Sequence, residues 1–138
     1  MKKRISKFLS MLLVLSCITT ATLSSASATS VEPRYTGLFS VTVSLNISSG
    51  GLSAPYGCAS LRSGYTADMT LELQRSSNGY SWSSINDWST SGSGMITLDK
   101  AYYVVSGYDY RSKCTTYVYD SNGSLVDSVV KYSATVSY

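Results

Sequence analysis

A strict alternation of apolar and polar residues from 39 to 48 is the feature that most constrains the fold of this chain. Every second position is apolar, and each intervening position is a serine, threonine or asparagine. A period of two puts one kind of side chain on each face of a β-strand, whereas a helix would scatter the apolar residues around its circumference. The pattern therefore predicts a long, half-buried strand whose apolar face is formed by Phe39, Val41, Val43, Leu45 and Ile47.

The rest of the chain shows more short-period patterning and no helical pattern. Asn78-Gly79 and Asn122-Gly123 each separate two alternating segments, which is the strongest local signal of a β-hairpin. The serine- and glycine-rich residues 89–94 predict a loop. No window places apolar residues at i, i+3, i+4 and i+7. The sequence thus predicts an all-β fold, a small antiparallel β-sandwich or barrel, with further strands near 56–61, 69–74, 95–98, 102–105, 108–119 and 125–132.

The phase of each alternating segment predicts which side chains face the interior. On the segment 108–119, Tyr110, Cys114 and Val118 share one face, and Tyr117 and Tyr119 share the other. We expect the core to contain Val41, Val43, Leu45, Leu71, Leu73, Trp82, Tyr110 and Val118.

The N-terminal segment has the three parts of a secretory signal peptide. Residues 1–7 are basic, residues 8–18 form an apolar run, and Ala26-Ser27-Ala28 has the small-residue pattern of a cleavage site. The apolar run is too short for a transmembrane helix, which needs about 20 residues. Cys17 leaves an alternative, because the residues before it loosely resemble a lipoprotein processing site. We predict a signal peptide at 1–28, a flexible lead at 29–37 and one β-sandwich domain at 38–138, secreted or held loosely at the cell wall.

Cleavage of this signal changes the charge of the protein. The whole chain has 11 basic and 8 acidic residues, a net charge of +3. Four basic residues lie in the signal segment, so the exported part has seven basic and eight acidic residues and a net charge of −1. The basic residues are scattered along it, which excludes the basic patch that binding to nucleic acid requires.

Two cysteines, Cys58 and Cys114, remain after cleavage. Exported pairs in an oxidising environment are usually joined, so we expect a Cys58–Cys114 disulfide, which would close a loop of about 57 residues and stabilise the fold by roughly 4 kcal/mol. A bridge between an early and a late strand is typical of an immunoglobulin-like sandwich. The match is partial, because no tryptophan follows Cys58 at the usual distance and Ser112 stands where a tyrosine is usual.

Several short motifs between residues 71 and 133 carry a family resemblance. They are Leu71-x-Leu73-Gln74-x-Ser76 with Gly79 and Trp82, then Trp88, Tyr103-Val104-Val105-Ser106-Gly107-Tyr108-x-Tyr110-Arg111, Val118-Tyr119-Asp120-Ser121-Asn122-Gly123 and Lys131-Tyr132-Ser133. The chain resembles an uncharacterised family of small proteins exported by Gram-positive bacteria, described as a domain of unknown function. The resemblance implies no catalytic residue, and the two cysteines are not part of its pattern.

The residue types present exclude several kinds of chemistry. The chain contains no histidine, which removes histidine-based nucleophilic catalysis and the usual zinc sites. Asp68 and Glu72 would share a strand face about 13 Å apart, too far for the carboxylate pair of a glycosidase, which needs less than about 10 Å. The run Asp120–Gly123 lacks the further ligands of a calcium loop and predicts a turn. We therefore expect no enzyme, no metal and no cofactor.

A non-catalytic binding or surface-interaction domain is the function that remains. Trp88 lies in a polar stretch and is expected to be exposed, and Tyr117 and Tyr119 form an aromatic pair on the second face of their strand. Exposed aromatics are enriched in binding sites, although cross-strand packing explains the tyrosines equally well. We expect an extracellular partner, such as a cell-wall glycan or a surface protein, and no membrane contact after cleavage. A small bacteriocin-like effector and a structural matrix component are the alternatives.

Overall fold

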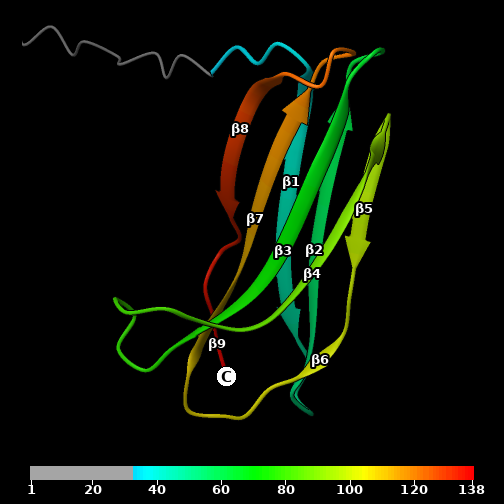
Figure 1. The fold of residues 1–138 in the computed structure, drawn as a ribbon. Helices are drawn as coiled ribbons and strands as arrows, with labels where there is room; N and C mark the ends of the chain where they lie inside the picture. The colour runs from blue at the N-terminus through cyan, green and yellow to red at the C-terminus, as the bar shows by residue number, and fades with distance from the viewer. Residues whose placement is uncertain (1–32) are drawn as a thin grey trace, which may run out of the picture. The chain divides into compact units, whose positions relative to one another are not determined.

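The computed structural model describes residues 33–138, and these residues fold into two antiparallel β-sheets that face each other (Figure 1). The predicted signal peptide at 1–28 and Cys17 lie outside the described residues. No helix that is long and apolar enough to cross a membrane occurs between residues 33 and 138. The strands are β1 (Leu38–Ile47), β2 (Leu52–Leu61), β3 (Thr66–Ser76), β4 (Ser83–Ser93), β5 (Met95–Asp99), β6 (Tyr102–Tyr103), β7 (Asp109–Tyr119), β8 (Leu125–Tyr132) and β9 (Val136–Ser137).

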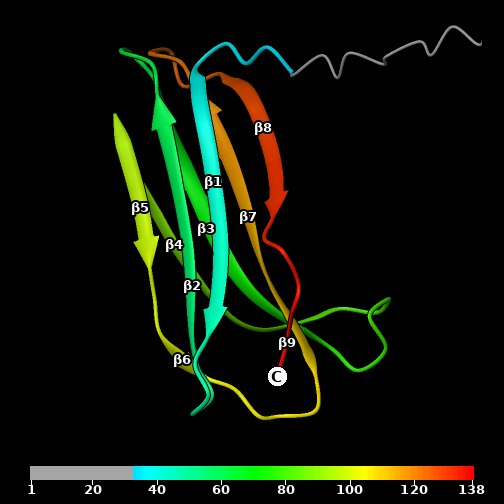
Figure 2. The same ribbon diagram turned by 180° about the vertical axis from the view of Figure 1, so that it is seen from behind.

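Each sheet combines strands from both halves of the domain. One has the order β1-β2-β5, with β6 also paired to β2, and the other has the order β4-β3-β7-β8, with β9 paired to β7. Figure 2 shows the first sheet in front of the second. The all-β prediction and the two-sheet sandwich are confirmed, and every strand pair is antiparallel.

The core lies between the sheets and consists of the inward side chains of each alternation. Val41, Leu71, Leu73, Tyr110 and Val118 are buried, as the sequence predicts. The predicted core residues Val43 and Leu45, towards the end of β1, are only half-buried. The prediction for Trp82 is wrong, because its ring lies on the outer face of the second sheet, against the guanidinium of Arg111.

The connection from β3 to β4 is a wider loop than the Asn-Gly hairpin predicted from the sequence. The hydroxyl of Ser76 accepts hydrogen bonds from the N–H groups of Asn78 and Gly79, and the Asn78 side chain accepts from Tyr80 and Ser81. These local bonds replace ladder pairing, so β4 begins only at Ser83. Figure 1 shows the loop projecting from the body of the domain.

Strand β4 then continues through residues 89–93, where the sequence predicts a loop. Its residues pair with β3 along its length, for example Thr70 with Ser89, whose hydroxyls are 2.9 Å apart. As an edge strand it needs little apolar surface, and Gly94, with a φ of +70°, turns the chain into β5. The loop prediction is wrong because cross-strand pairing, which local composition does not report, decides this segment.

The predicted Cys58–Cys114 disulfide is not present, and both residues are free cysteines. Odd-numbered residues of β2 face the core, so Cys58 points to the outer face of its sheet, whereas Cys114 is buried. Gly57 occupies the position opposite Cys114, and a Cβ added there would lie 3.5 Å from the Cys114 Sγ. An offset of one residue along a strand turns a side chain to the opposite face, and this offset separates Cys58 from Cys114. Without the disulfide, the stabilisation of roughly 4 kcal/mol expected from it is also absent.

Two charged side chains of β8 hold the edge of the sandwich beside β1. The Lys131 ammonium donates to the carbonyl oxygen of Val41 at 2.7 Å, and the Asp127 carboxylate accepts from the N–H groups of Thr36, Gly37 and Leu38 at 2.9, 2.7 and 3.0 Å. Partial burial alone would raise the pKa of Asp127, but these three donors outweigh it and hold the pKa below its ordinary value. The end of the N-terminal lead is therefore tied to β8.

Candidate binding surface

The two tryptophans occupy faces opposite to those that the sequence predicts. Trp88 is on the inner face of β4, where it pairs with Leu71, packs against the core and is half-buried. Its ring meets that of Tyr102 edge to face, with the ring centres 6.4 Å apart. The expectation that Trp88 is exposed is therefore wrong.

Tyr117 and Tyr119 lie on the outer face of β7, as the alternation predicts. Tyr117 is 42% exposed and Tyr119 is half-buried. The pairing of β7 with β8 brings Val130 and Tyr132, which are 49% and 47% exposed, onto the same outer face. With Trp82 beyond Tyr132, these residues form a line down the sheet that we call the aromatic stripe: Tyr119, Tyr117, Val130, Tyr132 and Trp82.

At the lower end of the aromatic stripe, one guanidinium lies over two aromatic rings. The guanidinium carbon of Arg111 lies 4.2 Å from the ring centre of Trp82 and 4.2 Å from that of Tyr132. Each aromatic face attracts the cation by about 0.5–2 kcal/mol, more where water is excluded. The stack attaches the β3–β4 loop, which carries Trp82, to strands β7 and β8.

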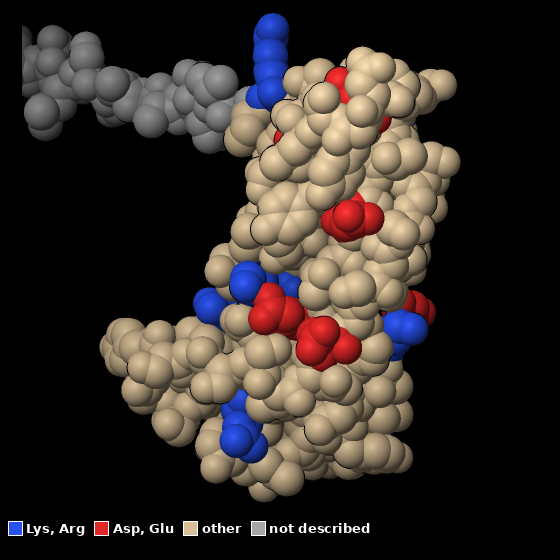
Figure 3. Space-filling model, viewed as in Figure 1, with Lys and Arg blue, Asp and Glu red and all other residues tan. Residues whose placement is uncertain are grey.

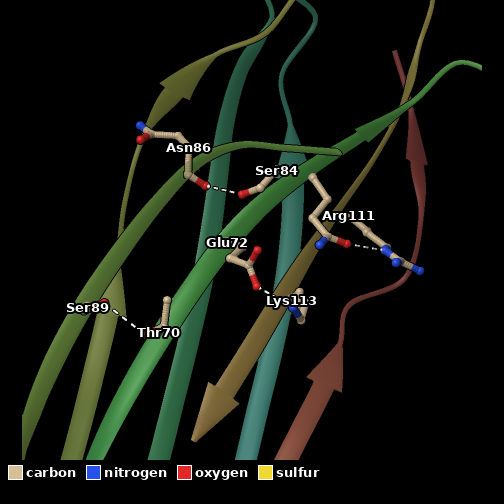
Figure 4. A network of polar contacts seen from close by, with 8 residues as sticks. Thr70, Glu72, Ser84, Asn86, Ser89, Arg111 and Lys113 are labelled. Carbon is tan, nitrogen blue, oxygen red and sulfur yellow. Dashed lines mark hydrogen bonds and ion pairs between the residues drawn. The ribbon is translucent and has the colours of Figure 1, made fainter. Parts of the chain in front are cut away.

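A buried amide fixes the rotation of the stacked guanidinium. Gln74 lies beside Arg111 on the outer face and is only 8% exposed. Its Oε1 accepts a hydrogen bond from Arg111 Nε at 2.9 Å (Figure 4). Because Gln74 is neutral, it orients the guanidinium without cancelling its charge.

One row further along the sheet, Glu72 and Lys113 form an ion pair of 2.7 Å, drawn in Figure 4. The hydrogen bond to Glu72 raises the pKa of the Lys113 ammonium. Asp87 of β4 stands directly opposite Glu72, so two carboxylates neighbour each other across the strands. In Figure 3 charged side chains gather across the middle of this face, and further acidic side chains lie above them and a basic one below.

This arrangement offers flat aromatic faces, fixed hydrogen-bond donors and a lysine-neutralised carboxylate on one open sheet surface. Groups of three or more potential metal ligands do not occur among residues 33–138. A separate open hollow of about 310 Å³ lies at the end of the domain where the C-terminus lies, lined by Ser77, Gly107, Tyr108, Asp109, Ser137 and Tyr138.

The sequence pattern predicts part of this surface and misses the rest. Alternation identifies Tyr117 and Tyr119, whereas it places Trp82 in the core and gives no role to Gln74, Arg111 and Tyr132. These four missed residues all lie in the motifs that carry the family resemblance. Their membership of those motifs is the one feature of the sequence that could have indicated them. The neighbouring carboxylates Glu72 and Asp87 are missed because only strand pairing brings them together.

No family model matches this chain, and no curated protein matches it.

Proposed function

We propose that this chain is an exported, non-catalytic binding domain with an immunoglobulin-like sandwich, and that it binds a cell-wall glycan or a surface protein through the aromatic stripe. The observation that carries the proposal is the alignment of exposed aromatic and apolar side chains along one sheet face. Tyr117, Val130 and Tyr132 are each more than 40% exposed there. Exposed apolar side chains in a contiguous line are costly in water and mark interaction sites.

The strand order supports the immunoglobulin-like part of the proposal. With β1, β2, β3, β4, β5, β7 and β8 taken as strands A, B, C, C′, E, F and G, the sheets become A-B-E and C′-C-F-G. Immunoglobulin-like sandwiches distribute their strands in this way. Tyr110, near the start of β7, donates its hydroxyl to the carbonyl oxygen of Val105, a hydrogen bond like that of the tyrosine corner of that fold, although Tyr110 lies two positions before the usual one, which Ser112 occupies.

Export is supported by the N-terminal sequence. The basic, apolar and small-residue parts of residues 1–28 match a cleavable signal, and the resemblance to small exported proteins of Gram-positive bacteria agrees with it. An extracellular domain meets cell-wall polymers and surface proteins, which are the partners that we propose.

The chemistry of the face favours binding over catalysis. The chain has no histidine to act as a general base, and Glu72 is held by Lys113. Glu72 and Asp87 stand on an open sheet surface, whereas glycosidase carboxylates flank a sugar that the enzyme encloses. We therefore expect no turnover of glycans or peptides.

A pull-down with isolated cell walls and with surface-protein extracts tests the proposal. Tyr117→Ala removes an exposed ring of the stripe and should weaken retention with little change in melting temperature, because the ring is 42% exposed. Tyr103→Ala is the matched control, since Tyr103 is 73% exposed but lies on β6 in the other sheet. Equal retention of the two variants, or turnover of any substrate, would contradict the proposal.

A further inference from the structure

We infer that Arg111 forms an anion-binding subsite at the lower end of the aromatic stripe, and that the ligand is an acidic polysaccharide whose carboxylate or phosphate groups bind there. This inference rests on the proposed binding function and names the ligand class. It draws on three observations: the fixed position of the guanidinium, its uncompensated charge, and the aromatic rings beside it.

The guanidinium of Arg111 is held in one orientation before any ligand arrives. Its Cζ lies 4.2 Å from the ring centres of both Trp82 and Tyr132, and Gln74 accepts a hydrogen bond from its Nε. A guanidinium has five N–H donors in a rigid fork, so the four on the two Nη atoms remain for a ligand. Because Gln74 already occupies Nε, the Nη donors are the ones left to bind a planar carboxylate or a phosphate through two hydrogen bonds. Little rotamer freedom is left to lose on binding, which favours affinity.

The charge of Arg111 has no acidic partner within the described part of the chain. The ion pair on this face joins Lys113 to Glu72 at 2.7 Å, which neutralises the neighbouring cation. No carboxylate of residues 33–138 forms an ion pair with Arg111, and its fixed partner is the neutral Gln74. Packing between two rings removes water from the guanidinium, and a partly desolvated charge attracts an anion more strongly than a fully hydrated one.

The rings beside this subsite indicate sugar as the rest of the ligand. Tyr132 covers Arg111 with one face and is still 47% exposed, and Tyr117 lies two rows along the same outer face. Aromatic faces carry negative charge density, which suits the C–H face of a sugar ring. Glu72 and Asp87 stand on β3 and β4, and Glu72 is paired with Lys113, whereas Asp68 of β3 lies directly opposite Tyr117, at the other end of the stripe from Arg111. Anionic groups carried on a sugar polymer therefore match a line of rings whose lower end holds Arg111, a cation without an ion-pair partner among residues 33–138.

The test measures affinity of the purified protein for three polymers: polygalacturonate, its fully methyl-esterified form, and a phosphomannan. The first and third carry carboxylate and phosphodiester groups, so they distinguish the two sources of the anion. Arg111→Gln should weaken binding to at least one anionic polymer by about tenfold or more, the loss expected for a charge-assisted pair of hydrogen bonds. Arg34→Gln is the control, because it removes the same charge from an exposed residue outside the stripe.

Arg111→Lys distinguishes loss of the anion site from loss of the positive charge beside the two rings. It keeps the positive charge but lacks the fork, so it should fold and still lose several-fold in affinity for the anionic polymer. Retained affinity in both Arg111 variants, equal binding of the charged and esterified polymers, or no binding to any of the three would overturn the inference. Preferential binding of acidic peptides in the same assay would also overturn it. None of these results would by itself remove the proposed function, which the Tyr117→Ala pull-down decides.

Discussion

Leu71→Ala should be among the most destabilising single changes in this domain. Leu71 lies near the middle of β3, is 0% exposed, and pairs with Trp88 on one side and Cys114 on the other. From the opposite sheet it meets Gly57, where an added Cβ would lie 3.3 Å from Leu71 Cδ1. The substitution therefore opens a cavity at the contact between the two sheets.

The magnitude follows from this packing. Loss of about three buried carbon groups removes roughly 2.4 kcal/mol of transfer free energy, at about 0.8 kcal/mol each. A residual cavity adds to this, and Leu→Ala changes in cores cost about 2–5 kcal/mol in total. Because one wall of the cavity is the backbone of Gly57, which has no side chain to move inwards, we expect about 3–5 kcal/mol. For a domain of this size, that lowers the melting temperature by about 12–20 °C.

Urea and thermal unfolding, followed by circular dichroism, measure the effect. Leu125→Ala is the matched control, because it makes the same chemical change at a residue that is 55% exposed at the start of β8. We expect the control to stay within about 0.5 kcal/mol of the wild type. If Leu71→Ala were no more destabilising than Leu125→Ala, the inward orientation of Leu71 on β3 would be refuted.

Three further predictions concern polar contacts and thiols. Asp127→Asn should lower the free energy of unfolding at pH 7 by about 1 kcal/mol, with allowance for solvent screening. Because the pKa of Asp127 is depressed in the folded state, this difference from the wild type should persist above about pH 4 and shrink as the pH falls through the folded pKa. Urea unfolding at a series of pH values measures it. Tyr110→Phe should cost about 1–2 kcal/mol in the same assay, since it keeps the buried ring but leaves the Val105 carbonyl without its hydroxyl donor. In the folded protein, N-ethylmaleimide should label Cys58 and spare Cys114, because the Cys114 thiol is buried and its pKa is raised. Peptide mass mapping measures the labelling. If it finds both cysteines labelled, or the two joined in a disulfide, the assigned faces are wrong.

The parts of the fold that can be predicted from the sequence are the strands with a long, two-sided pattern. In β3 and β7 the alternation extends over enough residues to set both the secondary structure and the buried face. In β1 it sets the strand, but a register shift between Leu38 and Ser40 buries Leu38 and leaves Phe39, predicted on the apolar face, 71% exposed. Strand β4 is partly missed because its edge position and small hydroxyl side chains give no apolar signal. The Cys58–Cys114 bridge is wrong for a related reason, since the weak pattern of β2 does not reveal which of two adjacent residues faces the core.

The candidate surface can be predicted only in part, because one extra residue in β4 decides which tryptophan it contains. Trp82 and Trp88 are six residues apart, so an unbroken strand would place both rings on one face. The pairing of β4 with β3 instead shifts between Leu73 and Gln74, which oppose Asn86 and Ser84 and leave one residue of β4 without a partner. Such a bulge reverses the alternation, so Trp88 packs inwards while Trp82 turns outwards to Arg111. The tryptophan of the aromatic stripe is thus selected by backbone register, which composition and spacing do not reveal.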